Sequence, residues 1–322
     1  NASQKAFNGI LVFELNANLN YRTGRSVSNS VWQGALLYNP TYPTHPNKET
    51  GRWDVDTNIA GHNTHPAETL EQESLSESLR TGINGRITVN IIDGLSASVF
   101  GSFDYNTNLG KSYTPNNQYS SIATRGRAGV TNAYQRNWMT SAQVAYNKEI
   151  GKHTINALAL VEAQEYYTFN NSANARGFDT NYFKYNNLQA GADVKYGDVS
   201  SSASRNNLLS YMARINYMFD NRYVVTINAR ADGSSKLGAN HKWGFFPSAS
   251  AAWIISNEEF MKGQKTVSNL KLRVGYGVTG NQNSISALNS LQMLSPNGLT
   301  TYNSQSTVTY AITSNSNPDL KW

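Results

Sequence analysis

Apolar and polar side chains occupy alternate positions along much of this chain. Between Gly82 and Tyr105, apolar residues stand mostly at odd positions and polar residues mostly at even positions. A period of two is typical of a β-strand with one apolar face. The pair Asp93-Gly94 interrupts the pattern, and such a pair favours a tight hairpin turn. This stretch therefore predicts a β-hairpin with one apolar face and one polar face.

The same unit recurs along the sequence. Further alternating stretches lie at 138–147, 155–161, 209–217, 223–230 and 270–276. Together with weaker stretches between them, they give roughly ten or eleven strands. We therefore predict an all-β fold.

The expected connections alternate between short and long. Short connections lie near residues 16–18, 93–94, 148–152 and 220–221, and a slightly longer one at 256–268 holds Glu258-Glu259 as a solvated turn. Long polar connections lie near 28–76, 108–133, 170–204 and 281–304. An up-and-down membrane barrel has tight turns on one side and extended outer loops on the other. Residues 1–322 therefore predict one antiparallel, up-and-down transmembrane β-barrel domain whose long connections are extracellular loops.

Charged side chains fall on the polar face of several expected strands. They are Arg86, Asp104, Arg214, Arg230 and Arg273. An unpaired ion in the dry core of a soluble β-sandwich costs several kcal/mol. The same charges are tolerated in a lumen that contains water. We therefore expect these residues to face the lumen of a barrel.

The composition agrees with a membrane barrel and excludes a helical membrane protein and a protein with disulfides or cysteine metal sites. Charged residues make up 15% of the chain, below the roughly 25% of ordinary soluble domains. The longest apolar runs, 157–161 and 251–255, are five residues long. A membrane helix needs about 20 apolar residues, whereas a spanning strand needs about 9–11 with only every second one apolar. The chain has no Cys, which excludes disulfides and cysteine metal sites.

Several motifs in the last third of the chain resemble a known family. The segment 222–261 contains Asp232-Gly233-Ser234-Ser235 and a Trp-Gly-Phe-Phe-Pro-Ser run at 243–248, and a Gly-Asn-Gln motif follows at 280–282. These motifs resemble the barrel signature of the SusC/RagA family of TonB-dependent outer-membrane importers. The first two thirds match mainly by hairpin rhythm. The signature residues to which we assign structural roles are Asp232, Gly233, Trp243, Gly244, Pro247, Trp253, Gly280 and Asn281.

The resemblance implies a fold, a location and partners. Members of this family have a barrel of roughly 22 strands around an N-terminal plug, and they lie in the outer membrane of Gram-negative bacteria. Import is driven by TonB, a SusD-like surface lipoprotein acts as a lid, and the substrates are oligosaccharides or peptides. We therefore expect this sequence to cover about half of such a barrel. The plug, the segment that binds TonB and the final strand are expected to lie outside it.

The first long connection carries the residues with candidate binding chemistry. Aromatic rings can stack on sugars or on a partner, so Trp32, Tyr38, Tyr42 and Trp53 are candidate substrate or partner contacts, with a purely structural role as the alternative. Imidazoles bind transition metals, so His45, His62 and His65 are candidate metal ligands. Their spacing fits no established metal motif, and a solvated polar loop is the alternative.

The remaining motifs carry no catalytic or cofactor chemistry. Gly275 to Gly280 fits G-x-G-x-x-G, but a dinucleotide site also needs a βαβ unit and an acidic residue about 20 positions later. No Ser-His-Asp grouping or basic cluster for nucleic acid is present. Tyr105, Trp138, Tyr146 and Tyr217 lie near expected strand ends, where aromatic belts anchor barrels in the headgroup region. We therefore expect neither an enzyme nor a cofactor.

Two other functions remain open at the level of sequence. One is a passive porin or protein-translocation barrel without TonB coupling, which conducts without a plug. The other is a soluble β-rich binding module, which dissolves without detergent. An active importer depends on TonB and on a plug encoded in the same gene.

Overall fold

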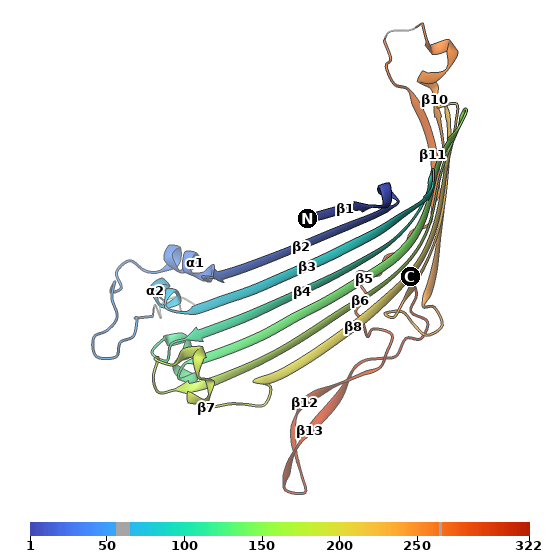
Figure 1. The fold of residues 1–322 in the computed structure, drawn as a ribbon. Coiled ribbons are helices and arrows are strands. Elements are labelled where there is room, and N and C mark those ends of the chain that lie inside the picture. Colours follow the sequence, from blue (N-terminus) through green and yellow to red (C-terminus); the bar gives the residue numbers. More distant parts are fainter. Residues whose placement is uncertain (56–64, 264–265) are drawn as a thin grey trace.

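A single curved layer of β-strands makes up most of the molecule. The computed structural model describes residues 1–55, 65–263 and 266–322. An antiparallel 11-stranded sheet follows the order of the chain, and only the short β7 lies off this path, beside β6 (Figure 1). A separate two-stranded sheet projects from it. This order is the up-and-down, all-β topology that the alternation predicts. The large sheet has the predicted number of strands, and the two strands of the small sheet come in addition.

The elements have the following bounds. The strands of the large sheet are β1 (Ala2–Ala6), β2 (Leu11–Arg25), β3 (Glu73–Ile92), β4 (Leu95–Thr114), β5 (Arg127–Ile150), β6 (His153–Phe178), β7 (Gly191–Asp193), β8 (Val199–Phe219), β9 (Tyr223–Ser234), β10 (Trp243–Ile254) and β11 (Lys271–Gly277). The small sheet pairs β12 (Met293–Tyr302) with β13 (Gln305–Ser314). The helices are α1 (Ser30–Leu37) and α2 (Pro66–Leu70), with short 3-10 turns η1 (Phe7–Gly9), η2 (Tyr119–Thr124), η3 (Lys184–Asn186), η4 (Leu188–Ala190), η5 (Ile255–Asn257) and η6 (Glu259–Met261). Within the described residues, no helix has the length and apolarity needed to span a bilayer.

Tight turns join the strands at one end of the sheet. Asp220 and Asn221 both have positive φ angles, 51° and 54°, which short polar side chains tolerate. Gly94 has a φ of 84°, and a Cβ there would lie 2.4 Å from the carbonyl oxygen of Asn147. These turns lie where the sequence predicts them. The turn expected near residues 16–18 is wrong, because β2 continues through it and the chain reverses at η1 instead.

The strands extend further into the long connections than the alternation predicts. β4 continues to Thr114 and β5 starts at Arg127, so only 115–126 connects them. Likewise β6 runs to Phe178, and the 281–304 connection holds β12 and the turn that leads into β13. In the outer parts of β4 and β6 both faces of a strand carry Asn, Ser and Thr, so the period of two disappears from the sequence there. Hydrogen bonding between neighbouring strands does not depend on that pattern.

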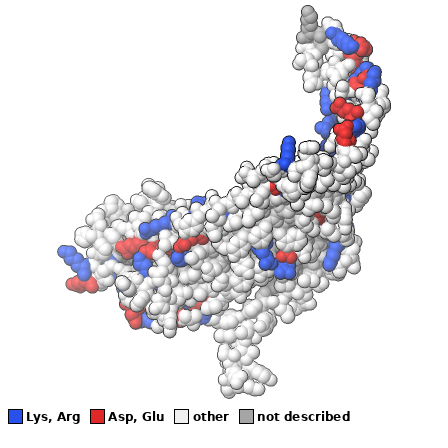
Figure 2. Space-filling model, viewed as in Figure 1, with Lys and Arg blue, Asp and Glu red and all other residues white. Residues whose placement is uncertain are grey.

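The pairing register sorts the side chains onto two faces. Ile87 lies opposite Val99, Val99 opposite Ala142, and Ala142 opposite Val161. We call the face that carries these residues the apolar face and the other the polar face. On β4 the apolar positions run from Leu95 to Phe103, which fits the length of a membrane-spanning strand. Charged side chains gather over both ends of the sheet (Figure 2).

Among residues 1–55, 65–263 and 266–322, no second layer covers the apolar face. Val99 is 55% exposed and Ile215 52% exposed, and most large apolar residues of the strands are exposed in the same way. A small buried core lies at the loop end, where Tyr113 and Phe178 meet with ring centroids 5.9 Å apart. The apolar residues of neighbouring strands therefore form a surface in the described structure, and not a dry interior.

A charge in the middle of the apolar face tests this assignment. We expect Val99→Arg in the complete protein to lower the free energy of unfolding in a bilayer by about 2–4 kcal/mol, the cost of arginine near the bilayer midplane. Urea unfolding in lipid vesicles measures it. Ser102→Arg, on the polar face of the same strand, is the control. An equal loss in the two variants would contradict the assignment of the faces.

Candidate functional site

The register places all five predicted lumen charges on the polar face. One row of directly opposed residues crosses the sheet through Glu14, Arg86, Phe100, Ser141, Glu162, Ser210 and Asp232. Asp104, Arg214 and Arg230 are separated by an even number of positions from the members of this row on their own strands, so they lie on the same face. Arg273 lies opposite Ala252 on that face. No ion pair joins any two of the five, all of which the structure describes. They share a surface that spans the sheet, not one cluster.

Two of these charges are held by local partners. The guanidinium of Arg86 lies 5.1 Å from the centroid of the Phe100 ring and 4.0 Å from the carboxylate of Glu14. Arg230 donates from Nε to both oxygens of Asp232, at 2.9 and 2.7 Å, and from a terminal nitrogen to Ser210 at 3.1 Å. Pairing of this kind offsets the cost of desolvating the ions. The structural role of the signature residue Asp232 is therefore to orient Arg230.

The polar face also contains a hollow that the sequence analysis missed. Its volume is about 440 Å³. Its lining includes Gln164, Tyr166, Asn206, Ser234, Lys236 and Gln282. Tyr166 donates to Gln164 at 2.5 Å, and the buried amide oxygen of Asn206 has no partner. Hydroxyl and amide groups at such a surface can bind the hydroxyls of a sugar or the amides of a peptide. Gln282 reaches Ser234 across 48 positions of sequence, a proximity that no local pattern indicates.

Three of the four predicted loop aromatics come together around a histidine. Trp53 stacks on His65 with centroids 4.2 Å apart, and Tyr38 packs edge-on against the same ring at 4.6 Å. Tyr42 contacts Tyr38 at 5.6 Å. Trp32 on α1 belongs to none of these contacts and is 76% exposed. We call Tyr38, Tyr42, Trp53 and His65 the loop cluster.

The candidate metal ligands have different surroundings. Nδ1 of His65 accepts a hydrogen bond from the backbone N–H of Ala67 at 3.1 Å and thereby caps α2, and burial lowers the pKa of this imidazole. His45 is exposed, and His62 lies outside the described residues. Among the residues that the structure does describe, no three His, Cys, Asp or Glu side chains form a group suited to a metal. The structure therefore assigns His65 a capping role.

A buried carboxylate joins the first two long connections. Glu68 on α2 is 1% exposed and accepts hydrogen bonds from the backbone N–H and the hydroxyl of Ser120 at 3.3 and 3.5 Å. Gln118 donates to the Glu68 carbonyl at 2.6 Å and accepts from Gln72 at 3.0 Å. The second carboxylate oxygen of Glu68 has no partner, and burial raises the pKa of this carboxyl. We call this contact the loop clasp.

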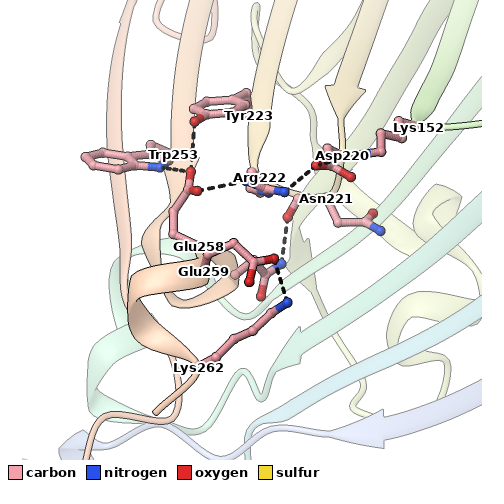
Figure 3. A network of polar contacts seen from close by, with 10 residues as sticks. Lys152, Asp220, Asn221, Arg222, Tyr223, Trp253, Glu258, Glu259 and Lys262 are labelled. Carbon is pink, nitrogen blue, oxygen red and sulfur yellow. Dashed lines mark hydrogen bonds and ion pairs between the residues drawn. The ribbon is translucent and has the colours of Figure 1, made fainter. Parts of the chain in front are cut away.

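A second polar network fixes the turn end of the sheet (Figure 3). The carboxylate of Glu258 accepts from Trp253 Nε1 at 2.9 Å, the Tyr223 hydroxyl at 2.8 Å and Arg222 at 2.9 Å. These donors, Trp253 foremost, lower the pKa of Glu258. The prediction of a solvated Glu258-Glu259 turn is therefore wrong for Glu258, which is 7% exposed. The network ties the β8–β9 turn to the link that follows β10.

Several signature residues have packing roles. A Cβ on Gly233 would lie 2.8 Å from the ring of Trp243, which itself stacks on Tyr211 at 5.8 Å. A Cβ on Gly280 would lie 2.4 Å from the ring of Phe246, and one on Gly244 would lie 2.6 Å from it. These glycines allow aromatic rings to lie directly against the backbone.

Two further signature residues shape the chain after β11. The Pro247 carbonyl accepts from the Val278 N–H at 3.0 Å. The side chain of Asn281 accepts from the N–H of Asn283 at 2.9 Å. These signature residues therefore lie at packing and turn positions of the sheet.

Comparisons with known proteins agree on one group. No family model matches the chain. The chain is 33% identical over 232 residues, 72% of its length, to the TonB-dependent receptor P3 of Formosa agariphila, of which it covers 23%. It is 28% identical over 309 residues, 88% of its length, to the TonB-dependent receptor SusC of Bacteroides thetaiotaomicron, of which it covers 30%. It therefore spans about a quarter of these relatives' own length.

Solved structures share the fold. The RagAB peptide transporter matches 98% of this chain with a TM-score of 0.77 at 23% sequence identity, and the chain covers 36% of the matched chain. The closed-closed state of the RagAB peptide importer gives a TM-score of 0.76. At this identity the likeness establishes the fold alone.

Removing the charge of Glu258 tests the turn network. Because the folded-state pKa of Glu258 is lowered, its stabilising contribution is present above the ordinary glutamate pKa of about 4.3 and is lost as pH falls through the folded value. We expect Glu258→Gln to make amides of the 220–223 turn exchange several-fold faster at neutral pH, and to remove the wild type's acid sensitivity. Hydrogen exchange on the complete protein measures both. Glu259→Gln is the control, since the exposed Glu259 carboxylate pairs with Lys262; equal acceleration there would contradict the role of Glu258.

The loop clasp is expected to respond to pH in the opposite direction. Burial raises the pKa of Glu68, so ionisation opposes folding at neutral pH and the penalty disappears as pH falls through the raised value. Glu68→Gln keeps an oxygen for Ser120 without the charge. We expect it to slow amide exchange in 66–70 and 119–124 at neutral pH and to change little in acid. Faster exchange at neutral pH would show that the charge itself holds the clasp.

Proposed function

This chain covers part of the β-barrel of a TonB-dependent receptor of the SusC/RagA family, in the outer membrane of a Gram-negative bacterium, and from that premise we propose that the complete protein is a TonB-driven importer of large nutrients such as oligosaccharides or peptides. The relatives are named as receptors, and none as an enzyme. In the proposal the sheet forms wall and lumen, and transport does not make or break a bond here.

One observation carries the proposal. The described sheet is a single layer with an uncovered apolar face and a polar face that carries paired and unpaired charges. Lipid against the first face and water against the second satisfy both. A soluble fold has no use for such an arrangement, because its apolar residues meet in an interior.

The proposal also assigns the two ends of the sheet. The tight turns face the periplasm and the long connections face outward, as in other outer-membrane barrels. A SusD-like lipoprotein lies over the long connections as a lid, and TonB acts through a segment outside this sequence. The names SusC and RagAB among the similar proteins support these partners.

Two surfaces are proposed to contact the substrate. The polar hollow near Tyr166 and Asn206 offers hydroxyl and amide groups along the lumen. The loop cluster offers an indole at the outer end, with Trp53 held by a hydrogen bond from its Nε1 to Glu71 at 2.9 Å. Rings held in this way lose little freedom when they stack on a sugar or a peptide.

Dependence on TonB tests the function as a whole. We expect a strain that produces the complete protein to take up labelled oligosaccharides or peptides only when TonB is intact. Uptake that persists without TonB, together with conductance of the purified protein in planar bilayers, would replace the importer by a passive pore.

Substitution in the loop cluster tests the outer contact. We expect Trp53→Ala in the complete protein to weaken substrate binding about tenfold, equivalent to about 1.4 kcal/mol. Calorimetry with the transported ligand measures the affinity. Trp32→Ala is the matched control, because Trp32 is exposed and lies outside the cluster. The same loss in both variants, or none in Trp53→Ala, would remove the cluster from the binding site.

A further inference from the structure

A row of alternating tyrosine and arginine crosses four strands on the apolar face. Tyr105 on β4 lies opposite Arg136 on β5, Arg136 opposite Tyr167 on β6, and Tyr167 opposite Arg205 on β8. Tyr105 and Arg136 lie two positions along their strands from the apolar pair Phe103 and Trp138, so they are on the apolar face. Tyr167 and Arg205 continue the same row and share that face. Charged residues are thus placed where a lipid-facing surface carries apolar ones.

The row lies at the border of the apolar band. On β5, Ile150 and Lys148 at the turn end are followed on this face by Tyr146, Val144, Ala142, Thr140 and Trp138 before Arg136 is reached. On β8 they run from Phe219 through Leu209 before Asn207 and Arg205. A strand crosses the hydrocarbon in about 9–11 residues. The arginines therefore stand at headgroup level on the side of the long connections.

The arginines are held in place and are only partly neutralised. Their guanidinium carbons lie 5.1 Å (Arg136) and 5.4 Å (Arg205) from the centroid of the Tyr167 ring. Both guanidinium groups also approach the carboxylate of Glu165, at 3.6 and 3.9 Å. Glu165 is 15% exposed, whereas the arginine side chains are 41% and 56% exposed. One sheltered carboxylate thus faces two cations, and N–H donors of both remain open to the surroundings.

We propose that this row binds the phosphate groups of anionic lipid in the outer leaflet. A guanidinium presents paired donors that match phosphate oxygens. Tyr105 and Tyr167 supply rings at the same level, where aromatic residues anchor barrels. The excess positive charge, its height above the apolar band and its position on the lipid face select a lipid headgroup. The proposal relies on the proposed function only for the orientation of the sheet.

Lipid binding to the complete, delipidated protein tests this inference. Native mass spectrometry in detergent measures the affinity for phosphorylated lipid A and for its dephosphorylated form. We expect the double variant Arg136→Gln/Arg205→Gln to weaken binding of the phosphorylated lipid about tenfold or more, and to leave the weaker binding of the dephosphorylated lipid unchanged. Tyr167→Leu should weaken binding by removing the ring that supports both arginines, and Tyr167→Phe should preserve it.

Arg80→Gln is the matched control. Arg80 is next to Thr81, which lies opposite Tyr105, so it stands at the same height on the polar face. An equal loss in Arg80→Gln would reduce the effect to net charge and overturn the proposal, as would unchanged binding in the double variant. Displacement of the lipid by millimolar inorganic phosphate would identify a free anion as the ligand instead. Arginine-dependent retention of a lid lipoprotein without lipid would assign the row to a protein partner.

Uptake in the same strains separates this inference from the proposed function. Wild-type protein that retains phosphorylated lipid but shows no TonB-dependent uptake would contradict only the importer. TonB-dependent uptake together with lipid binding that ignores both arginines would contradict only the lipid site. Urea unfolding of each variant verifies that the barrel is folded.

Discussion

Inside a bilayer each backbone N–H and C=O needs a partner from the protein, and here the antiparallel register supplies those partners from strand to strand. This constraint gives the chain its single layer. A strand that is bonded on both sides can present its side chains only to the two faces, so each residue meets one of two solvents. The edge strands β1 and β11, and the parts of β2 and β10 that extend beyond them, are the exceptions, because each has one ladder of backbone groups that a complete barrel must pair.

Most of the sheet could be predicted because each residue of a strand faces either lipid or water. The sequence therefore shows the strands directly as an alternation of apolar and polar residues. The alternation alone predicts that Arg86 and Arg230 share one surface, and in the pairing register both lie on the polar face. The predictions fail where the alternation of apolar and polar residues does not distinguish a strand from a turn. Asn16 and Asn18 lie on the wet face of β2, where asparagine is simply polar, and in the sequence they look like turn residues. Beyond the membrane both faces are wet, so the outer ends of β4 and β6 carry no alternation that would predict a strand.

The polar networks could not be predicted for a different reason. Glu68 meets Ser120 across 52 positions and Glu258 meets Arg222 across 36. Such contacts depend on how connections fold over the ends of the sheet, and no spacing within one strand encodes them. The resemblance to the family identifies the signature residues but does not say which structural role each of them has. Gly233 and Gly280 are explained only when Trp243 and Phe246 are seen against the backbone at those positions.

The two ends of the sheet are built for different tasks. At the turn end, Glu258 satisfies its carboxylate with three donors from neighbouring elements, and such charge-assisted bonds are among the strongest that side chains form. At the loop end the clasp holds a carboxylate that is buried with one oxygen unpaired, a contact that stores an unfavourable energy in the folded state. A surface that must open and close around a ligand is drawn from the less stable parts of a structure. The energetic contrast between Glu258 and Glu68 therefore places the more stable contacts at the tight turns and the less stable ones at the long connections.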